Sequence, residues 1–465
     1  MLNSQSVLEP DEPGWLPFAP QPGETLRVAL RRTLRDVIRS GALRPGVPLP
    51  ASRALARQLG LSRGVVSDAY QQLESEGYLL TRPRAAPVVG AVVATPTPRP
   101  RTTAARRTAI YDMTPTTPDV TLFPLRRWLA AYDEVVRRSP AATLDYREPR
   151  GEEALREALA DYLGRTRGVV ADPERIVVVQ GTAQAVDLLL RVLKARGRVR
   201  IAVEDPSHAT QHERIRALQL ELVAQPIDQE GVITEGLDSD GLLVTPAHQF
   251  PAGCVLSGPR RRQLLEWSTT QGALLVEDDY DAEFRYDREP VRALQGLGPD
   301  RVAYVGTVSK TLAPALRLGW VVAPDSLVDE LVWMKRLADD FTPALDQLTL
   351  AALIRSGEYD RHLRSARVVY RRRRDRLATS LAKHFPRLTV EGIAAGVHLL
   401  VRLPPHVDDA AIVAEARHAK IAVQALSYYQ IRARGSGLVL GYGRLHESAI
   451  DAALGALAAI VDRHL

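Results

Sequence analysis

The stretch VAYVGTVSK, residues 302–310, is the part of the sequence from which the fold can be predicted. Its first residues, 302–305, are apolar or β-branched and predict a buried strand, which Gly306 ends. Seven residues after Lys310 comes Arg317, so one loop could supply both an amine nucleophile and an anion-binding guanidinium. An ε-amine condenses with a carbonyl to give a Schiff base, and arginine binds phosphate through two parallel donors. Most lysines are solvated surface charges, so Lys310 alone is weak evidence for a functional site. It becomes informative only together with partner residues elsewhere in the chain.

Polar groups follow four other predicted strands. In chain order, these strands are residues 176–179, the stretch that begins at Ile201, and residues 242–245 and 273–276. In an open α/β sheet, ligands bind beyond the carboxyl ends of the parallel strands. A glycine turn before a helix can bind an anion there through exposed amides and the helix dipole. The groups expected at this edge are the turn Gly181-Thr182-Ala183, His208, the turn 246–253 and the acidic stretch 277–281.

These groups match the needs of pyridoxal 5′-phosphate. A carboxylate keeps the pyridine nitrogen protonated, a phenol can hydrogen-bond the ring oxygen, and a lysine holds the aldehyde. Asp278, Tyr280 and Lys310 are the candidates for these three roles, and the imidazole of His208 could lie flat on the ring. The stretch 277–281 could instead be a solvated or metal-binding loop, but nothing near it has metal-ligand spacing, so we expect no metal site.

The basic residues concentrate in the first quarter of the chain. Residues 1–111 hold 15 Lys and Arg against 8 Asp and Glu, whereas the whole chain of 465 residues has a net charge of only +6. This asymmetry points to a nucleic-acid-binding module joined to a near-neutral domain. The single Cys254, a start without signal-peptide features and the lack of a long apolar stretch predict a cytoplasmic protein.

Residues 24–90 predict a winged helix-turn-helix. A first helix, with leucines at helical spacing, starts near Glu24. Ser52 is expected to cap a short second helix over residues 53–59. Ser62 is expected to cap a third helix that ends at about residue 76. Two short strands around Arg82 and Arg84 would form a basic wing. The candidate DNA contacts are Arg53, Ser62 and Arg63 at the helix starts, with Arg82 and Arg84 on the wing. Each arginine could instead lie on a solvated surface.

The remaining organisation follows from composition. Residues 1–23 and 91–111 are rich in proline and lack periodicity, which predicts an N-terminal arm and a semi-extended linker. Helical and strand patterns alternate from residue 112 to residue 465, which predicts an α/β domain with a mainly parallel sheet. We expect its smaller lobe at about residues 345–465.

Both parts resemble known families. The stretches 49–53 (LPASR), 61–63 (LSR) and 69–78 (AYQQLESEGY) resemble the winged helix-turn-helix of GntR-type bacterial regulators. Residues 112–465 resemble a fold-type I aminotransferase, with 277–284 (EDDYDAEF) and 309–319 (SKTLAPALRLG) as the stretches that carry the likeness. Joined in one chain, the two parts resemble the MocR family of regulators.

The resemblance implies several site assignments and an assembly. It implies that the cofactor phosphate is held by Arg317, Thr307, Ser309 and the turn Gly181 to Ala183, and that His208 stacks on the cofactor ring. It also implies a domain-swapped homodimer, in which each DNA-binding head crosses to the partner's cofactor domain.

Two positions depart from the aminotransferase pattern. Val439 stands where an arginine usually binds the substrate carboxylate, and Phe250 stands where transaminases carry an asparagine near the cofactor oxygen. Nearby arginines that could replace the missing clamp are Arg432, Arg434 and Arg444. These departures favour a transcriptional regulator that senses an effector, either pyridoxal phosphate itself, with control of vitamin B6 synthesis, or an amine. A catalytically active aminotransferase with an accessory DNA-binding head is the competing hypothesis, and a cofactor-free dimerisation scaffold is a third.

Overall fold

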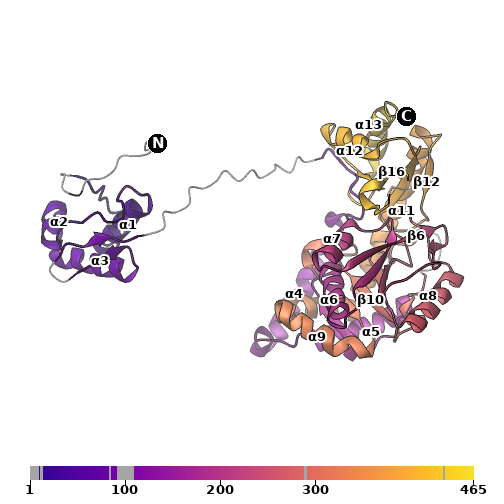
Figure 1. Ribbon diagram of the computed structural model, residues 1–465, viewed down its shortest axis with the longest axis horizontal. Coiled ribbons are helices and arrows are strands. Elements are labelled where there is room, and N and C mark those ends of the chain that lie inside the picture. The colour runs from indigo at the N-terminus through magenta and orange to yellow at the C-terminus, as the bar shows by residue number, and fades with distance from the viewer. Residues whose placement is uncertain (1–9, 11–13, 83–84, 92–108, 287–290, 433–434) are drawn as a thin grey trace. The chain divides into compact units, whose positions relative to one another are not determined.

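The computed structural model describes residue 10 and residues 14–82, 85–91, 109–286, 291–432 and 435–465. The chain divides into two compact units, Met1–Arg106 and Arg107–Leu465 (Figure 1). No helix among the described residues combines the length and the apolar character that crossing a membrane requires.

The first unit is a winged helix-turn-helix, as the sequence predicted. Its elements are α1 (Leu26–Arg39), α2 (Ser52–Leu59), α3 (Arg63–Ser75) and the antiparallel hairpin of β1 (Leu79–Leu80) and β2 (Val88–Val89). The stripe of α1 that includes Leu30 and Leu34 packs against Leu55, Val66 and Leu73 in one buried cluster. Because each of these helices is amphipathic, the three bury their apolar faces against one another.

The helix caps differ in one place from the prediction. Ser62 caps α3, since its hydroxyl accepts a hydrogen bond from the backbone N–H of Val65 at 3.4 Å. Ser52, however, is the first residue of α2, and the capping position falls on Ala51, which supplies no side-chain hydrogen bond. The start of α2 is instead held from α3, where the hydroxyl of Tyr70 donates to the carbonyl of Pro50 at 2.8 Å.

The larger lobe of the second unit is an eight-stranded sheet with the order β4-β11-β10-β9-β8-β5-β6-β7. Strands β11 and β7 run antiparallel to their neighbours, and all other neighbouring pairs are parallel. The mainly parallel α/β sheet is therefore confirmed. The strands are β4 (Ile176–Val179), β5 (Arg200–Asp205), β6 (Glu221–Asp228), β7 (Gly231–Val232), β8 (Gly241–Val244), β9 (Leu274–Asp279), β10 (Val302–Thr307) and β11 (Gly319–Val322).

Helices cover both faces of this sheet because successive strand residues point to opposite sides. On β4, Val177 and Val179 face a core shared with α6 and α9, whereas Ile176 and Val178 face one shared with α5 and α10. A third cluster, against α8, completes the cover. The helices of this lobe are α4 (Leu125–Arg138), α5 (Glu153–Arg167), α6 (Thr182–Ala195), α7 (Ala209–Ala217), α8 (Gly258–Gln271), α9 (Asp325–Asp339) and α10 (Ala344–Arg355).

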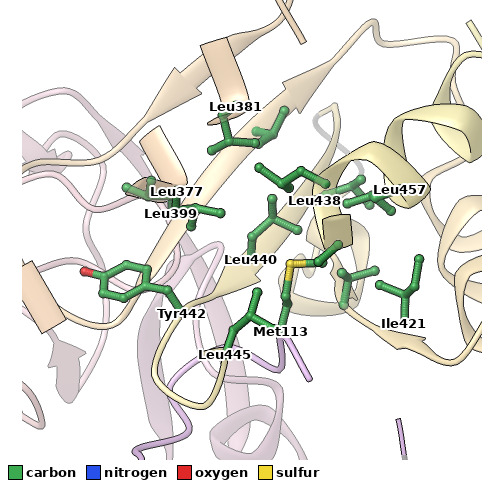
Figure 2. Close-up of a cluster of buried hydrophobic side chains, with 14 of the residues drawn as sticks. Met113, Leu377, Leu381, Leu399, Ile421, Leu438, Leu440, Tyr442, Leu445 and Leu457 are labelled. Atoms are coloured by element: carbon green, nitrogen blue, oxygen red, sulfur yellow. The ribbon is translucent and has the colours of Figure 1, made fainter. Parts of the chain in front are cut away.

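The smaller lobe is built on an antiparallel sheet of four strands, β12-β13-β16-β15. Leu399, Leu438 and Leu440 of this sheet pack with Leu377 and Leu457 from the helices (Figure 2). The elements are α11 (Glu358–His384), β12 (Thr389–Glu391), β13 (His398–Leu403), α12 (Asp409–His418), β14 (Ile421–Ala422), β15 (Gln424–Ala425), β16 (Ser436–Gly441) and α13 (Ile450–Val461).

The lobe boundary differs from the position near residue 345 that we expected. Helix α10 packs in the large lobe, and within α11 Leu363 lies in the large-lobe core whereas Ala366 and Tyr370 lie in the small-lobe core. The chain therefore passes between lobes inside α11. The small lobe also includes the segment before α4, because β3 (Tyr111–Asp112) pairs with β14. Such a long-range pairing has no signal in local sequence.

Strand β10 also runs further than its sequence indicated. It continues through Gly306 to Thr307. The glycine does not end the strand, because its missing side chain makes room for a neighbour: a Cβ at position 306 would lie 2.4 Å from Nε1 of Trp320 on the adjacent strand.

Candidate cofactor site and DNA-binding surface

A cavity of about 360 Å³ lies beyond the carboxyl ends of β4, β5, β9 and β10. It contains every residue that we predicted to contact the cofactor except Gly181. The lining residues are Thr116, Thr182, Ala183, Val186, His208, Thr210, Gln211, Arg214, Asp278, Tyr280, Thr307, Ser309, Lys310, Pro314 and Arg317. The turn after β8, which we expected at the same edge, does not line this cavity.

Gly181 shapes the cavity from just outside it. It is the N-cap of α6 with φ 77°, a conformation that favours glycine. A Cβ at this position would lie 3.3 Å from Nη1 of Arg317, so the glycine lets the guanidinium lie against the turn. Arg317 donates from Nη2 to the carbonyl of Gln180 at 2.5 Å. The turn thus brings an arginine to the positive end of a helix.

Two hydroxyls complete this end of the cavity. Thr307 donates to the carbonyl of Leu318 at 2.9 Å, and its oxygen lies 2.9 Å from the hydroxyl of Ser309 and accepts the Ser309 backbone N–H at 3.1 Å. A helix N-terminus, a guanidinium and hydroxyl donors are together a suitable environment for a phosphate dianion.

Asp278 lies at the other end of the cavity, and one of its carboxylate oxygens has no hydrogen-bond donor. Its Oδ2 accepts a hydrogen bond from Nε2 of Gln211 at 3.1 Å, whereas its Oδ1 is buried and has no hydrogen-bond partner. Burial, with a further contribution from Asp279, raises the pKa of the Asp278 carboxyl to about 7. A buried acceptor without a donor is costly, and a protonated pyridine nitrogen would satisfy it. The site therefore fits pyridoxal phosphate. Gln211 was not among the residues predicted from the sequence, because it has the pattern of an ordinary helix residue.

Lys310 is placed for nucleophilic chemistry. It follows β10, and burial lowers the pKa of its amine, while the nearby carboxylates of Asp281 and Asp278 oppose the shift. A lowered pKa increases the fraction of neutral amine, which is the form that attacks a carbonyl.

His208 and Tyr280 form one wall of the cavity. The imidazole of His208 stacks on Phe250, with ring centroids 3.9 Å apart and 6° between the planes. Burial lowers the pKa of His208 to about 3, so the ring is neutral. Tyr280 stands edge-on to it, with centroids 5.7 Å apart, and its hydroxyl donates to the backbone carbonyl of His248 at 3.3 Å.

No arginine clamp replaces Val439 among the residues that the structure describes. Val439 is fully buried in an apolar cluster with Ala209, Phe250, Leu400, Leu426 and Tyr429. Arg444 pairs with Asp112 at 3.1 Å, Arg432 is exposed, and Arg434 lies outside the described residues. Arg214 of α7 does line the cavity, and the sequence analysis missed it because a helical arginine has the pattern of a surface residue.

The acidic stretch is not a solvated loop. Glu277 accepts the backbone N–H groups of Leu294 and Gln295, each at 2.9 Å, and Asp279 pairs with the buried Arg167 at 2.7 Å. The fold also brings two histidines, His248 and His398, close to Asp281 at the end of this stretch.

The DNA-binding candidates gather at the turn between α2 and α3. Arg53 and Arg63 line a hollow around Gly60 and Leu61, together with Arg57, which we had not predicted. Arg82 is exposed, and Arg84 lies outside the described residues. Three arginines around the start of a recognition helix form a surface that suits phosphate and base edges.

Asp68 is an acidic residue of the recognition helix α3. It forms an ion pair with Arg27 of α1 at 2.9 Å. Its charge is thus partly offset within the unit.

Comparison with known proteins defines the class. Residues 26–89 match the family of bacterial regulatory proteins of the gntR family, and residues 116–445 match aminotransferase class I and II. The protein is a transcriptional regulator with a GntR-type head and an aminotransferase-like domain. It belongs to the MocR family.

Individual relatives support this placement. The chain is 32% identical over 444 residues to the HTH-type pyridoxine biosynthesis transcriptional regulator PdxR of Corynebacterium glutamicum, covering 94% of this chain and 96% of the relative. It is 30% identical over 439 residues to the probable rhizopine catabolism regulatory protein MocR of Rhizobium meliloti, covering 89% of each. An archaeal alanine:glyoxylate aminotransferase shares the fold, with a TM-score of 0.71 and 24% identity over 76% of this chain and 91% of that chain.

Proposed function

We propose that this regulator binds pyridoxal 5′-phosphate in the cavity beside Lys310 and that the bound cofactor changes its affinity for DNA. One contrast carries the proposal. The cavity offers the lysine, the unpartnered Asp278 oxygen and the Arg317 anion site, whereas Val439 and its apolar neighbours occupy the place of a carboxylate clamp. A site equipped for the cofactor, with an apolar residue at the expected clamp position, favours the cofactor as effector.

Each residue would then have a defined role. Lys310 would hold the aldehyde carbon and Asp278 the pyridine nitrogen, while Tyr280 would reorient its hydroxyl toward the ring oxygen. Arg317, Thr307, Ser309 and the turn Gly181-Thr182-Ala183 would hold the phosphate. When bound, the cofactor supplies a conjugated, electron-accepting ring.

Hydrogen bonds link this site to the small lobe. Ser207, next to His208, donates its backbone N–H to the carbonyl of Tyr429 at 3.0 Å. Asp205 accepts the backbone N–H groups of Ile431 and Arg432 at 2.9 and 3.1 Å. A ring stacked on His208 would lie next to these hydrogen bonds between the lobes. Such coupling requires that the cofactor bind two conformations of the protein with different affinities.

DNA binding by a homodimer is part of the proposal, with each head crossing to the partner's cofactor domain. Large apolar side chains on and after α4 support a self-association face, since Leu125, Leu129, Leu144 and Tyr146 are exposed. Contiguous exposed apolar surface often marks a site of protein–protein contact. The relative PdxR, named for pyridoxine biosynthesis, supports vitamin B6 synthesis as the controlled process.

The test is a cofactor titration of full-length wild type, Lys310→Ala and the control Lys383→Ala, an exposed lysine paired with Asp451. Visible absorption reports covalent binding, and fluorescence anisotropy reports affinity for the protein's own upstream DNA. We expect a new visible band and a change in DNA affinity in wild type and the control, but neither in Lys310→Ala. A band without any change in DNA affinity would refute the cofactor as effector.

The aminotransferase hypothesis has its own outcome. Lys310 and Asp278 also suit amino-group transfer. Release of a keto acid from an added amino acid, at many turnovers per chain, would establish an enzyme instead of a sensor.

A further inference from the structure

Three buried side chains that belong to none of the roles above converge beside the cofactor cavity. His248 follows β8, Asp281 follows β9, and His398 begins β13 of the small lobe. Their exposed fractions are 3%, 1% and 2%, and one donor atom of each lies within 4.8 Å of the others. Nδ1 of His248 is 3.0 Å from Oδ2 of Asp281.

His398 is the member whose bonding is incomplete. Neither of its ring nitrogens makes a hydrogen bond of normal geometry in the described part of the chain. A neutral imidazole without a partner is costly inside a protein, and it is the form of histidine that binds metals.

The surroundings keep this space open. Gly396, with φ 67°, lies just before His398, and a Cβ there would be 2.2 Å from Cε1 of His248 and 2.6 Å from Oδ2 of Asp281. A side chain at position 396 would displace two of the three donors.

We infer that His248, Asp281 and His398 form a binding site for a divalent transition-metal ion of the zinc type. Two imidazoles and one carboxylate are the donors that such ions prefer over calcium or magnesium. In a tetrahedral shell with bonds of about 2.1 Å, neighbouring donors lie roughly 3.4 Å apart. Donor atoms that now lie as far as 4.8 Å from one another must therefore move closer by up to about 1.4 Å.

The ion would connect two parts of the protein. His248 and Asp281 belong to the large lobe and His398 to the small lobe, so one ion would join the lobes. The hydroxyl of Tyr280, which lines the cofactor cavity, lies 3.3 Å from Nδ1 of His248. The ion would therefore also lie next to the cofactor site.

The experiment uses untagged, full-length, cofactor-free protein that has been stripped with a chelator. Isothermal titration with Zn²⁺ and the visible spectrum with Co²⁺ are measured for wild type, His398→Gln, Asp281→Asn and the control His406→Gln, an exposed histidine. We expect one ion per wild-type and control chain, with at least tenfold weaker binding in the other two variants.

Absence of stoichiometric binding to wild type, or undiminished binding by folded variants, would overturn the assignment. If circular dichroism shows that the variants do not fold, zinc-edge X-ray absorption of wild type decides instead. A zinc ion coordinated by two imidazoles and by oxygen ligands would support the site. Coordination by sulfur, or by oxygen alone, would overturn it. Neither readout depends on whether the cofactor controls DNA binding.

Discussion

The imidazole of His208 and the ring of Phe250 lie parallel, with centroids 3.9 Å apart. Phe250, which we expected in place of a transaminase asparagine, does not line the cavity. Since His208 does line the cavity, Phe250 supports the far side of the ring on which the cofactor would stack.

Phe250→Leu should therefore weaken cofactor binding without removing a cofactor contact. A stacked aromatic pair contributes about 0.5–1.5 kcal/mol, which corresponds to roughly two- to tenfold in the dissociation constant. Absorption titration measures the effect. Phe385→Leu, in the small-lobe core, should destabilise the protein but leave the dissociation constant unchanged. Equal effects of both variants would contradict a specific role for Phe250.

Asp278→Asn should weaken cofactor binding further. The replacement removes the charge that would stabilise a protonated pyridine, and hydrogen bonds to charged groups contribute about 1.5–3 kcal/mol. We expect roughly 10- to 100-fold weaker binding by absorption titration, with the band shifted. Asp451→Asn, at a half-buried position in the first turn of α13, serves as the control. Unchanged binding would exclude Asp278 as the partner of the ring nitrogen.

We expect the arginines around Gly60 to contact DNA in two ways, through a base or through a phosphate. Arg63→Ala should cost about 1–3 kcal/mol of DNA binding and relax sequence preference if it contacts a base. Arg57→Ala should weaken binding to all sequences and reduce the salt dependence by about one unit, as loss of a phosphate contact does. Anisotropy titrations over a salt series measure both. Arg262→Ala, in the cofactor unit, changes the net charge equally and should match wild type. A wild-type salt slope in Arg57→Ala would exclude a phosphate contact.

Glu204 should make stability depend on pH. Burial raises the pKa of its carboxyl to about 7 from the usual 4.5, although the backbone N–H and hydroxyl of Thr245 donate to it. The unfolded chain loses this proton at lower pH than the folded one. The contribution of Glu204 to folding stability is therefore fully present below pH 4.5 and is lost as the pH rises through about 7.

Glu204→Gln should remove this loss of folding stability at rising pH. For a pKa shift of this size, the loss is of the order of 3 kcal/mol in the free energy of unfolding. Thermal unfolding at several pH values between about 5 and 8 measures it. The exposed Glu266→Gln provides the comparison. Identical pH profiles in the two variants would contradict the assignment.

Local sequence predicted the features that depend on local interactions. Helix periodicity placed the three helices of the head, and the Ser62 cap follows from a hydroxyl three residues before an orphan N–H. Strands followed by polar residues located most of the cavity, because the carboxyl ends of parallel strands meet at one edge.

Features that depend on contacts distant in the chain could not be predicted this way. Gly306 has the pattern of a strand end, yet the strand continues because Trp320 fills the space beside it. Arg57 and Gln211 have the pattern of ordinary helix residues until the fold places them at a site.

The amino-acid sequence alone predicted that a basic winged helix-turn-helix precedes an aminotransferase-like domain with a lysine, an aspartate and an arginine at its strand ends. The surroundings of these groups depend on the tertiary structure. Folding buried Asp278 with one oxygen unpartnered, packed Val439 among apolar rings and brought His398 from the small lobe to Asp281. Bonding and burial arise from residues far apart in the chain, so they exist only once the lobes have folded against each other.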